Sequence, residues 1–118
     1  MSKHVLTVIE DLLFTVKIND AAKKAGMRPE FVKSAHDALE KARTQPSLIV
    51  IDLNCHSIDV LKLIGDLKAD EEIAKIPVIG FVSHVQGDLK KQAQDAGCDT
   101  VLARSAFSMN LNSILARY

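Results

Sequence analysis

The feature that most constrains the fold is a repeated alternation of short apolar runs with longer segments of helical period. This alternation is typical of α/β proteins, in which helices connect parallel strands and cover both faces of one sheet. We expect strands over residues 5–9, 30–32, 48–52, 76–82 and 100–103. The sequence therefore predicts a single (βα)5 domain over residues 1–118.

The segments between these runs have the spacing of helices with one buried face. Helices are expected over residues 12–25, 35–42, 60–68 and 88–96, and a last one from about residue 107. Gly26 and Gly97 stand where a left-handed residue commonly ends a helix. In the third helix the apolar residues recur at i, i+3, i+4 and i+7, so Lys62, Asp66 and Lys68 are expected to point outward.

Length and charge exclude several classes of protein. A chain of 118 residues suits one domain with one core. Its 15 basic and 15 acidic side chains cancel, so nucleic acid is not an expected partner. No stretch approaches the roughly 18 apolar residues of a membrane span, and the N-terminus lacks a signal-peptide pattern, so we expect a cytoplasmic protein. Cys55 and Cys98 form no C-x-x-C pair and are expected to be free thiols.

The order of the strands follows from the handedness of their connections. Right-handed crossovers in a five-stranded parallel sheet favour the doubly wound, flavodoxin-like order 2-1-3-4-5. The first and third strands are then neighbours at the point where the order reverses. Ligands and chemistry collect at the carboxyl ends of the strands there, so this edge is where we expect a site.

Asp52 ends the most apolar run of the chain, "LIVID", at that edge. Burying an unpaired carboxylate costs several kcal/mol, so its charge needs a use or a partner. The same edge should hold Glu10 and Asp11 from the first strand, Ser83 from the fourth and Arg104 from the fifth. These residues are far apart in sequence and converge only through the topology.

Carboxylates that converge repel one another unless a cation neutralises them. Oxygen ligands of this kind suit Mg²⁺, and Arg104 is the other available neutraliser. Two structural alternatives stand beside the metal site. Asp52 can cap the following turn or pair with Arg104, and Glu10 and Asp11 can be ordinary acids at a helix N-terminus.

Over essentially its whole length, the chain resembles the receiver domain of two-component response regulators. The residues that carry the resemblance are "VIEDLL", "LIVIDLN", "IPVIGFVSHV" and "AGCDTVLARS". It implies that Asp52 accepts a phosphoryl group from a histidine kinase or phosphotransfer protein. It also implies that Glu10 or Asp11, with Asp52 and the Asn54 carbonyl, binds Mg²⁺.

The chain departs from the family's pattern in the same segments. Val82 stands at the position of the family's hydroxyl residue, with Ser83 directly after it, and Arg104 replaces a lysine. Ser105 replaces a proline. These departures resemble an atypical, pseudo-receiver subgroup, in which the domain binds partners without being phosphorylated.

The resemblance predicts a signalling module in a phosphorelay and not an enzyme. Its implied partners are a histidine kinase, a downstream protein target and a second copy, the last through the face of the fourth helix, fifth strand and fifth helix. No output domain and no membrane contact are expected. A flavodoxin-like binding protein or enzyme is disfavoured, because "IEDLLF" lacks the glycines of a phosphate-binding loop.

Overall fold

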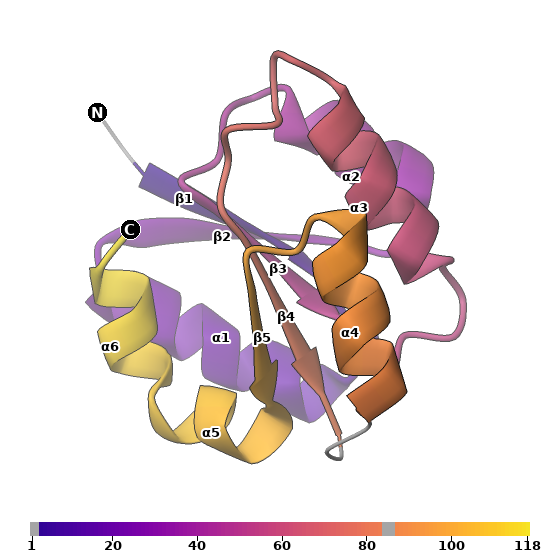
Figure 1. The fold of residues 1–118 in the computed structure, drawn as a ribbon. Coiled ribbons are helices and arrows are strands. Elements are labelled where there is room, and N and C mark those ends of the chain that lie inside the picture. Colours follow the sequence, from indigo (N-terminus) through magenta and orange to yellow (C-terminus); the bar gives the residue numbers. More distant parts are fainter. Residues whose placement is uncertain (1–2, 84–86) are drawn as a thin grey trace.

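The computed structural model describes residues 3–83 and 87–118 and contains one parallel sheet of five strands (Figure 1). The strands are β1 (Lys3–Val8), β2 (Met27–Val32), β3 (Leu48–Asp52), β4 (Val78–Val82) and β5 (Thr100–Ala103). Their order in the sheet is β2-β1-β3-β4-β5, and every neighbouring pair is parallel. The predicted fold class and strand order are confirmed.

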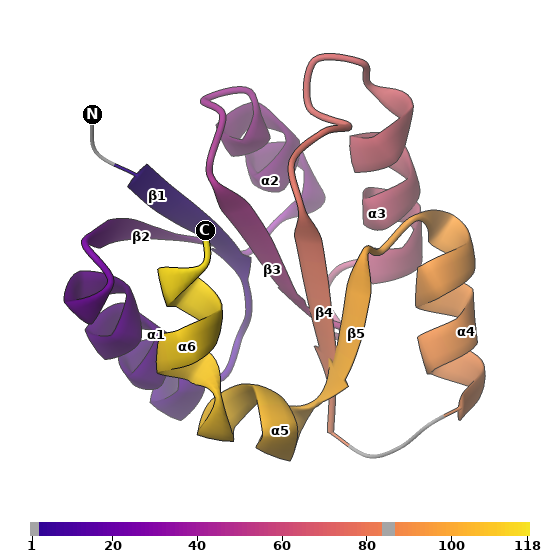
Figure 2. The same cartoon turned by 60° about the vertical axis from the view of Figure 1, so that its left-hand side comes forward.

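The helices form a layer on each face of the sheet (Figure 2). They are α1 (Leu12–Lys24), α2 (Ala35–Ala42), α3 (Val60–Ala69), α4 (Gly87–Ala96), α5 (Arg104–Met109) and α6 (Leu111–Ala116). Helices α1, α5 and α6 cover one face, and α2, α3 and α4 cover the other. Within the described ranges, no helix is both long enough and apolar enough to cross a membrane.

The core consists of one apolar cluster on each face of the sheet. All five residues of β3 are buried, as expected for the central strand of such a sheet. On the face of α1, the rings of Phe14, Phe81 and Phe107 stack in parallel, with centroids 4.9, 5.0 and 5.7 Å apart. This aromatic stack joins the first turn of α1, the strand β4 and the helix α5.

Most predicted element ends hold within a few residues. Gly26 (φ +73°) and Gly97 (φ +115°) have the left-handed backbone expected after α1 and α4. The second strand is longer than predicted and includes Pro29. Because β2 lies at the sheet edge and pairs only with β1, the missing donor of Pro29 is tolerated there.

Two local predictions are wrong. The last helix is two helices, since α5 ends at Met109 and the next residue, Asn110, donates a side-chain hydrogen bond (2.9 Å) to the Ala106 carbonyl. Lys68 does not point outward. Its Nζ donates to the carbonyls of Ala74 (3.1 Å) and Ile76 (3.0 Å) in the segment that leads from α3 into β4.

Candidate functional site

Asp52 lies at the carboxyl end of β3, between the ends of β1 and β4. It is 6% exposed, and its Oδ1 accepts a hydrogen bond from the Asn54 amide (2.9 Å). The Asn54 side chain in turn accepts one from the Ser83 amide (2.7 Å), which ties the loop after β3 to the end of β4. Asp52 therefore caps the turn that follows it, as the structural alternative predicted.

Burial dominates the electrostatics of Asp52. Removal of its carboxyl group from water raises the pKa of Asp52, and the nearby charges of Asp11 and Glu10 raise it further. The Asn54 amide and the Arg104 charge oppose the rise without cancelling it. This environment favours the neutral carboxylic acid more than an ordinary exposed site would.

Glu10 directs its carboxylate to the loop after β3. Its Oε1 accepts hydrogen bonds from the Cys55 thiol (2.9 Å), the Ser57 amide (3.1 Å) and the Ser57 hydroxyl. The Cys55 thiol and the two Ser57 donors lower the pKa of Glu10 to about 2. The acid that the family pattern favours as the main metal ligand is thus fully ionised near neutral pH and already hydrogen-bonded.

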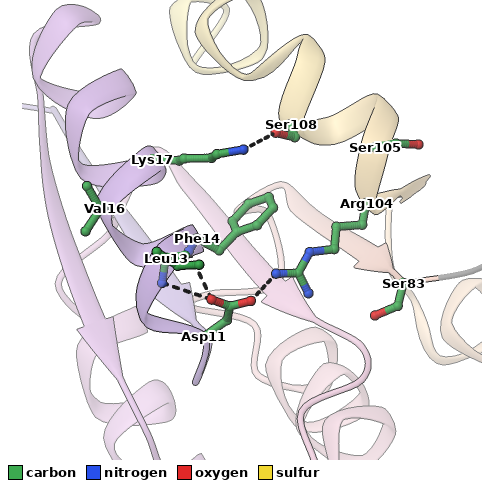
Figure 3. A pocket seen from close by; sticks show the side chains of 9 residues that line it. All are labelled: Asp11, Leu13, Phe14, Val16, Lys17, Ser83, Arg104, Ser105 and Ser108. Atoms are coloured by element: carbon green, nitrogen blue, oxygen red, sulfur yellow. Dashed lines mark hydrogen bonds and ion pairs between the residues drawn. The ribbon is translucent and has the colours of Figure 1, made fainter.

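The two carboxylate oxygens of Asp11 have different partners (Figure 3). Oδ1 caps α1 by accepting from the amides of Leu13 (2.9 Å) and Phe14 (3.1 Å). Oδ2 forms an ion pair with the guanidinium of Arg104. The Arg104 bond, followed by the Phe14 amide, lowers the pKa of Asp11. Asp11 is therefore an acid at a helix N-terminus, which was the structural alternative to its predicted role as a metal ligand.

Arg104 is the first residue of α5 and extends over the ring of Phe14, with its guanidinium carbon 4.8 Å from the ring centroid. The alternative in which Arg104 pairs with Asp52 is wrong, because the guanidinium forms its ion pair with Asp11. No sequence signal shows that the ring of Phe14 carries a cation, since its helical spacing indicates only a core residue.

A pocket of about 680 Å³ opens between α1 and α5 beside this ion pair (Figure 3). Asp11, Phe14 and Arg104 line it, together with Ser83 and with Lys17, whose Nζ donates to the Ser108 hydroxyl (3.3 Å). Ser83 therefore lies where it was predicted, near Arg104. Val82 instead packs in the buried apolar cluster on the α3 side of the sheet, so it supplies no polar group to this edge.

The predicted acids share an edge but do not form a cluster of metal ligands. Among the described residues, the one group of acids, histidines and cysteines with ligand atoms within 4.8 Å of one another is His36, Asp37 and Glu40, all exposed. Glu10 is bonded to Ser57 and Cys55, and Asp11 to Arg104 and the α1 amides. As arranged, these residues do not fit Mg²⁺.

Comparison with known proteins supports the resemblance to receiver domains. The polar-differentiation response regulator DivK of Brucella ovis is 27% identical over 105 residues, which are 88% of this chain and 85% of DivK. DivK of Brucella anthropi is 25% identical over the same shares. No family model matches the chain.

Solved structures show the same fold. The chemotaxis response regulator CheY4 of Vibrio cholerae superposes with a TM-score of 0.84 over 99% of this chain and 98% of its own, at 17% identity. The receiver domain of a sensor histidine kinase from Pseudomonas aeruginosa, with a magnesium ion in its active site cleft, gives 0.83 over 100% and 98%, at 22% identity. The chain therefore has the fold of a receiver domain and resembles response regulators of two-component signalling in sequence.

Proposed function

We propose that this chain is a receiver-like, non-enzymatic domain of two-component signalling that binds partner proteins without a phosphoryl group on Asp52. The observation that carries the proposal is the ion pair between Arg104 and Asp11. In this ion pair the cation at the acidic edge is bound to Asp11 and not to Asp52. Asp52 is buried and Val82 lies in the apolar core, so neither the cation nor a hydroxyl from position 82 is available to a phosphoryl group on Asp52.

Exposed apolar side chains support a role in protein binding. Leu12, Leu13 and Val16 at the start of α1 are 75, 80 and 58% exposed, and Met109 at the end of α5 is 85% exposed. Large apolar side chains grouped on a surface are common at interaction sites. In this proposal the partners are proteins of a phosphorelay, such as a histidine kinase or a downstream target, and the location is the cytoplasm. Dimerisation through α4, β5 and α5 stays a prediction.

The second candidate is the family's reaction, with Asp52 as phosphoacceptor and Mg²⁺ as cofactor. The similarity to DivK and the place of Asp52 at the end of β3 favour it. A partner's phosphohistidine would transfer its phosphoryl group to an ionised Asp52 carboxylate. Two features of this structure oppose that transfer, since burial raises the pKa of Asp52 and the Arg104 guanidinium is paired with Asp11. The metal role of the Asn54 carbonyl belongs to this candidate.

Intact-mass measurement separates the two candidates. The protein is incubated with Mg²⁺ and acetyl phosphate, alongside its Asp52→Asn variant and, as a positive control, the cyanobacterial phytochrome response regulator RcpA, which has been solved in its phosphorylated form. We expect RcpA to gain mass and this chain to stay unchanged. A phosphate-sized gain that is absent from Asp52→Asn would overturn the proposal and establish the second candidate.

A further inference from the structure

We propose that the Arg104 guanidinium is a built-in counter-ion of the acidic edge, so that the folded chain compensates Asp11 without a divalent cation. The inference rests on the proposed function in one respect, since both require the ion pair between Arg104 and Asp11 to persist in solution. It goes further by assigning Arg104 the role of a resident cation. It also predicts that the loss of this one charge opens the edge to metal ions.

Two independent contacts hold the guanidinium in place. One is the ion pair with Asp11, in which the Arg104 and Asp11 side chains are 31% and 33% exposed. The other is a cation–π contact with Phe14, in which the guanidinium carbon lies 4.8 Å from the ring centroid. A planar guanidinium can bind a carboxylate along its edge while its face lies on an aromatic ring, whereas a lysine ammonium cannot do both in this way.

The ring below Arg104 is itself held by packing. Phe14 stacks on Phe81 at 4.9 Å and on Phe107 at 5.7 Å, and the three rings are within 15° of parallel. Such a stack leaves little freedom to turn one ring, so the surface that carries the guanidinium is fixed by the core. The position of the cation is therefore prepared by the fold.

Asp11 is equally constrained, because its other oxygen caps α1. A metal ion at Asp11 would have to displace a prepositioned charge and lose part of its own hydration shell, which Mg²⁺ gives up reluctantly. Glu10 uses its Oε1 to accept from Cys55 and Ser57, so its Oε2 is the atom that an ion could reach once Arg104 no longer neutralises Asp11. Arg104 therefore neutralises Asp11 from within the chain.

The test measures ion binding directly and does not depend on phosphorylation. The folded wild type is titrated with Mn²⁺ and with Mg²⁺ by calorimetry, and its thermal midpoint is compared in MgCl2 and in NaCl of equal ionic strength. The same midpoints are measured for Arg104→Met, which keeps a long side chain without charge. Lys17→Met is the matched control, since Lys17 is a cation in the same pocket that is bonded only to Ser108 among the described residues.

We expect no saturable heat and no Mg²⁺-dependent midpoint shift for the wild type or Lys17→Met. Arg104→Met should gain a rise of about 5 °C when Mg²⁺ is at about tenfold its dissociation constant. Saturable binding to the wild type, or a folded Arg104→Met that gains no response, would overturn the inference. If Arg104→Met does not fold, the wild-type calorimetry alone decides. Ion binding by a wild type that still accepts no phosphate would contradict this inference and leave the proposed function in place.

Discussion

The two ends of the sheet each hold a cation beside a carboxylate, but the cations have different partners. At the start of β4, Lys68 binds Asp99 (2.8 Å) and two main-chain carbonyls, and Asp99 also accepts from the Val78 amide (2.8 Å). At the opposite edge, Arg104 contacts the side chains of Asp11 and Phe14. Main-chain partners stay in place while the fold persists, whereas side-chain partners can be exchanged. The Lys68 cluster is therefore structural, and the Arg104 cluster is where a functional change can occur.

The largest effect in this comparison should come from Lys68→Met. The substitution removes the Lys68 donor from the carbonyls of Ala74 and Ile76 and leaves Asp99 with its bond from the Val78 amide alone, so we expect a loss of about 2–3 kcal/mol in the free energy of unfolding. Urea denaturation measures it. Lys62→Met, an exposed cation on the same helix, should cost less than about 0.5 kcal/mol. Equal losses in the two variants would show that the Lys68 contacts do not stabilise the fold.

Arg104→Met should cost less, about 1 kcal/mol, because its ion pair and its ring contact are both partly exposed. Asp11→Asn removes the same ion pair while an asparagine still caps α1. A double-mutant cycle by urea denaturation should therefore show coupling between the two positions of about 0.5 kcal/mol. Additive losses would mean that the pair contributes no net stability in solution.

Asp52→Asn should remove the loss of stability that comes from burying an ionised carboxylate. A raised pKa means that the folded protein binds more protons than the unfolded chain, so wild-type stability falls as pH rises from the ordinary value of 3.8 through the raised one. The variant has no such group and should gain stability relative to the wild type over that window, with a constant difference above it. Urea denaturation of both proteins from about pH 3 to about pH 8 measures this difference, because that range includes the ordinary carboxyl pKa and values raised above it. A difference with the opposite slope would show that the Asp52 pKa is lowered.

The smallest effect concerns Glu10, which is exposed. Its pKa of about 2, against an ordinary 4.5, means that its hydrogen bonds stabilise the fold above the ordinary value and that this stabilisation is lost as pH falls toward 2. Carbon-13 NMR titration of Glu10 should give the low value in the wild type and a higher one in Ser57→Ala. An unchanged pKa in that variant would show that the Ser57 hydroxyl does not donate to Glu10 in solution.

The alternation of strands and helices was sufficient to predict the topology, and through it the shared edge of Asp52, Asp11 and Arg104. The pairing within that edge was not predictable. Which carboxylate Arg104 contacts depends on where the ring of Phe14 stands in the aromatic stack, and this is a property of packing. The prediction that Lys68 points outward was wrong for a related reason. Helical spacing gives the direction of a side chain, but it does not give the path of the loop that packs over that side chain.

A crystal structure grown in millimolar MgCl2 tests the central claim most directly. We predict that the guanidinium of Arg104 lies between Asp11 and Phe14, and that Asp52 remains bonded to the Asn54 amide with no ion beside it. A magnesium ion coordinated by Asp52 and Glu10, with Arg104 turned away from Asp11, would contradict the account.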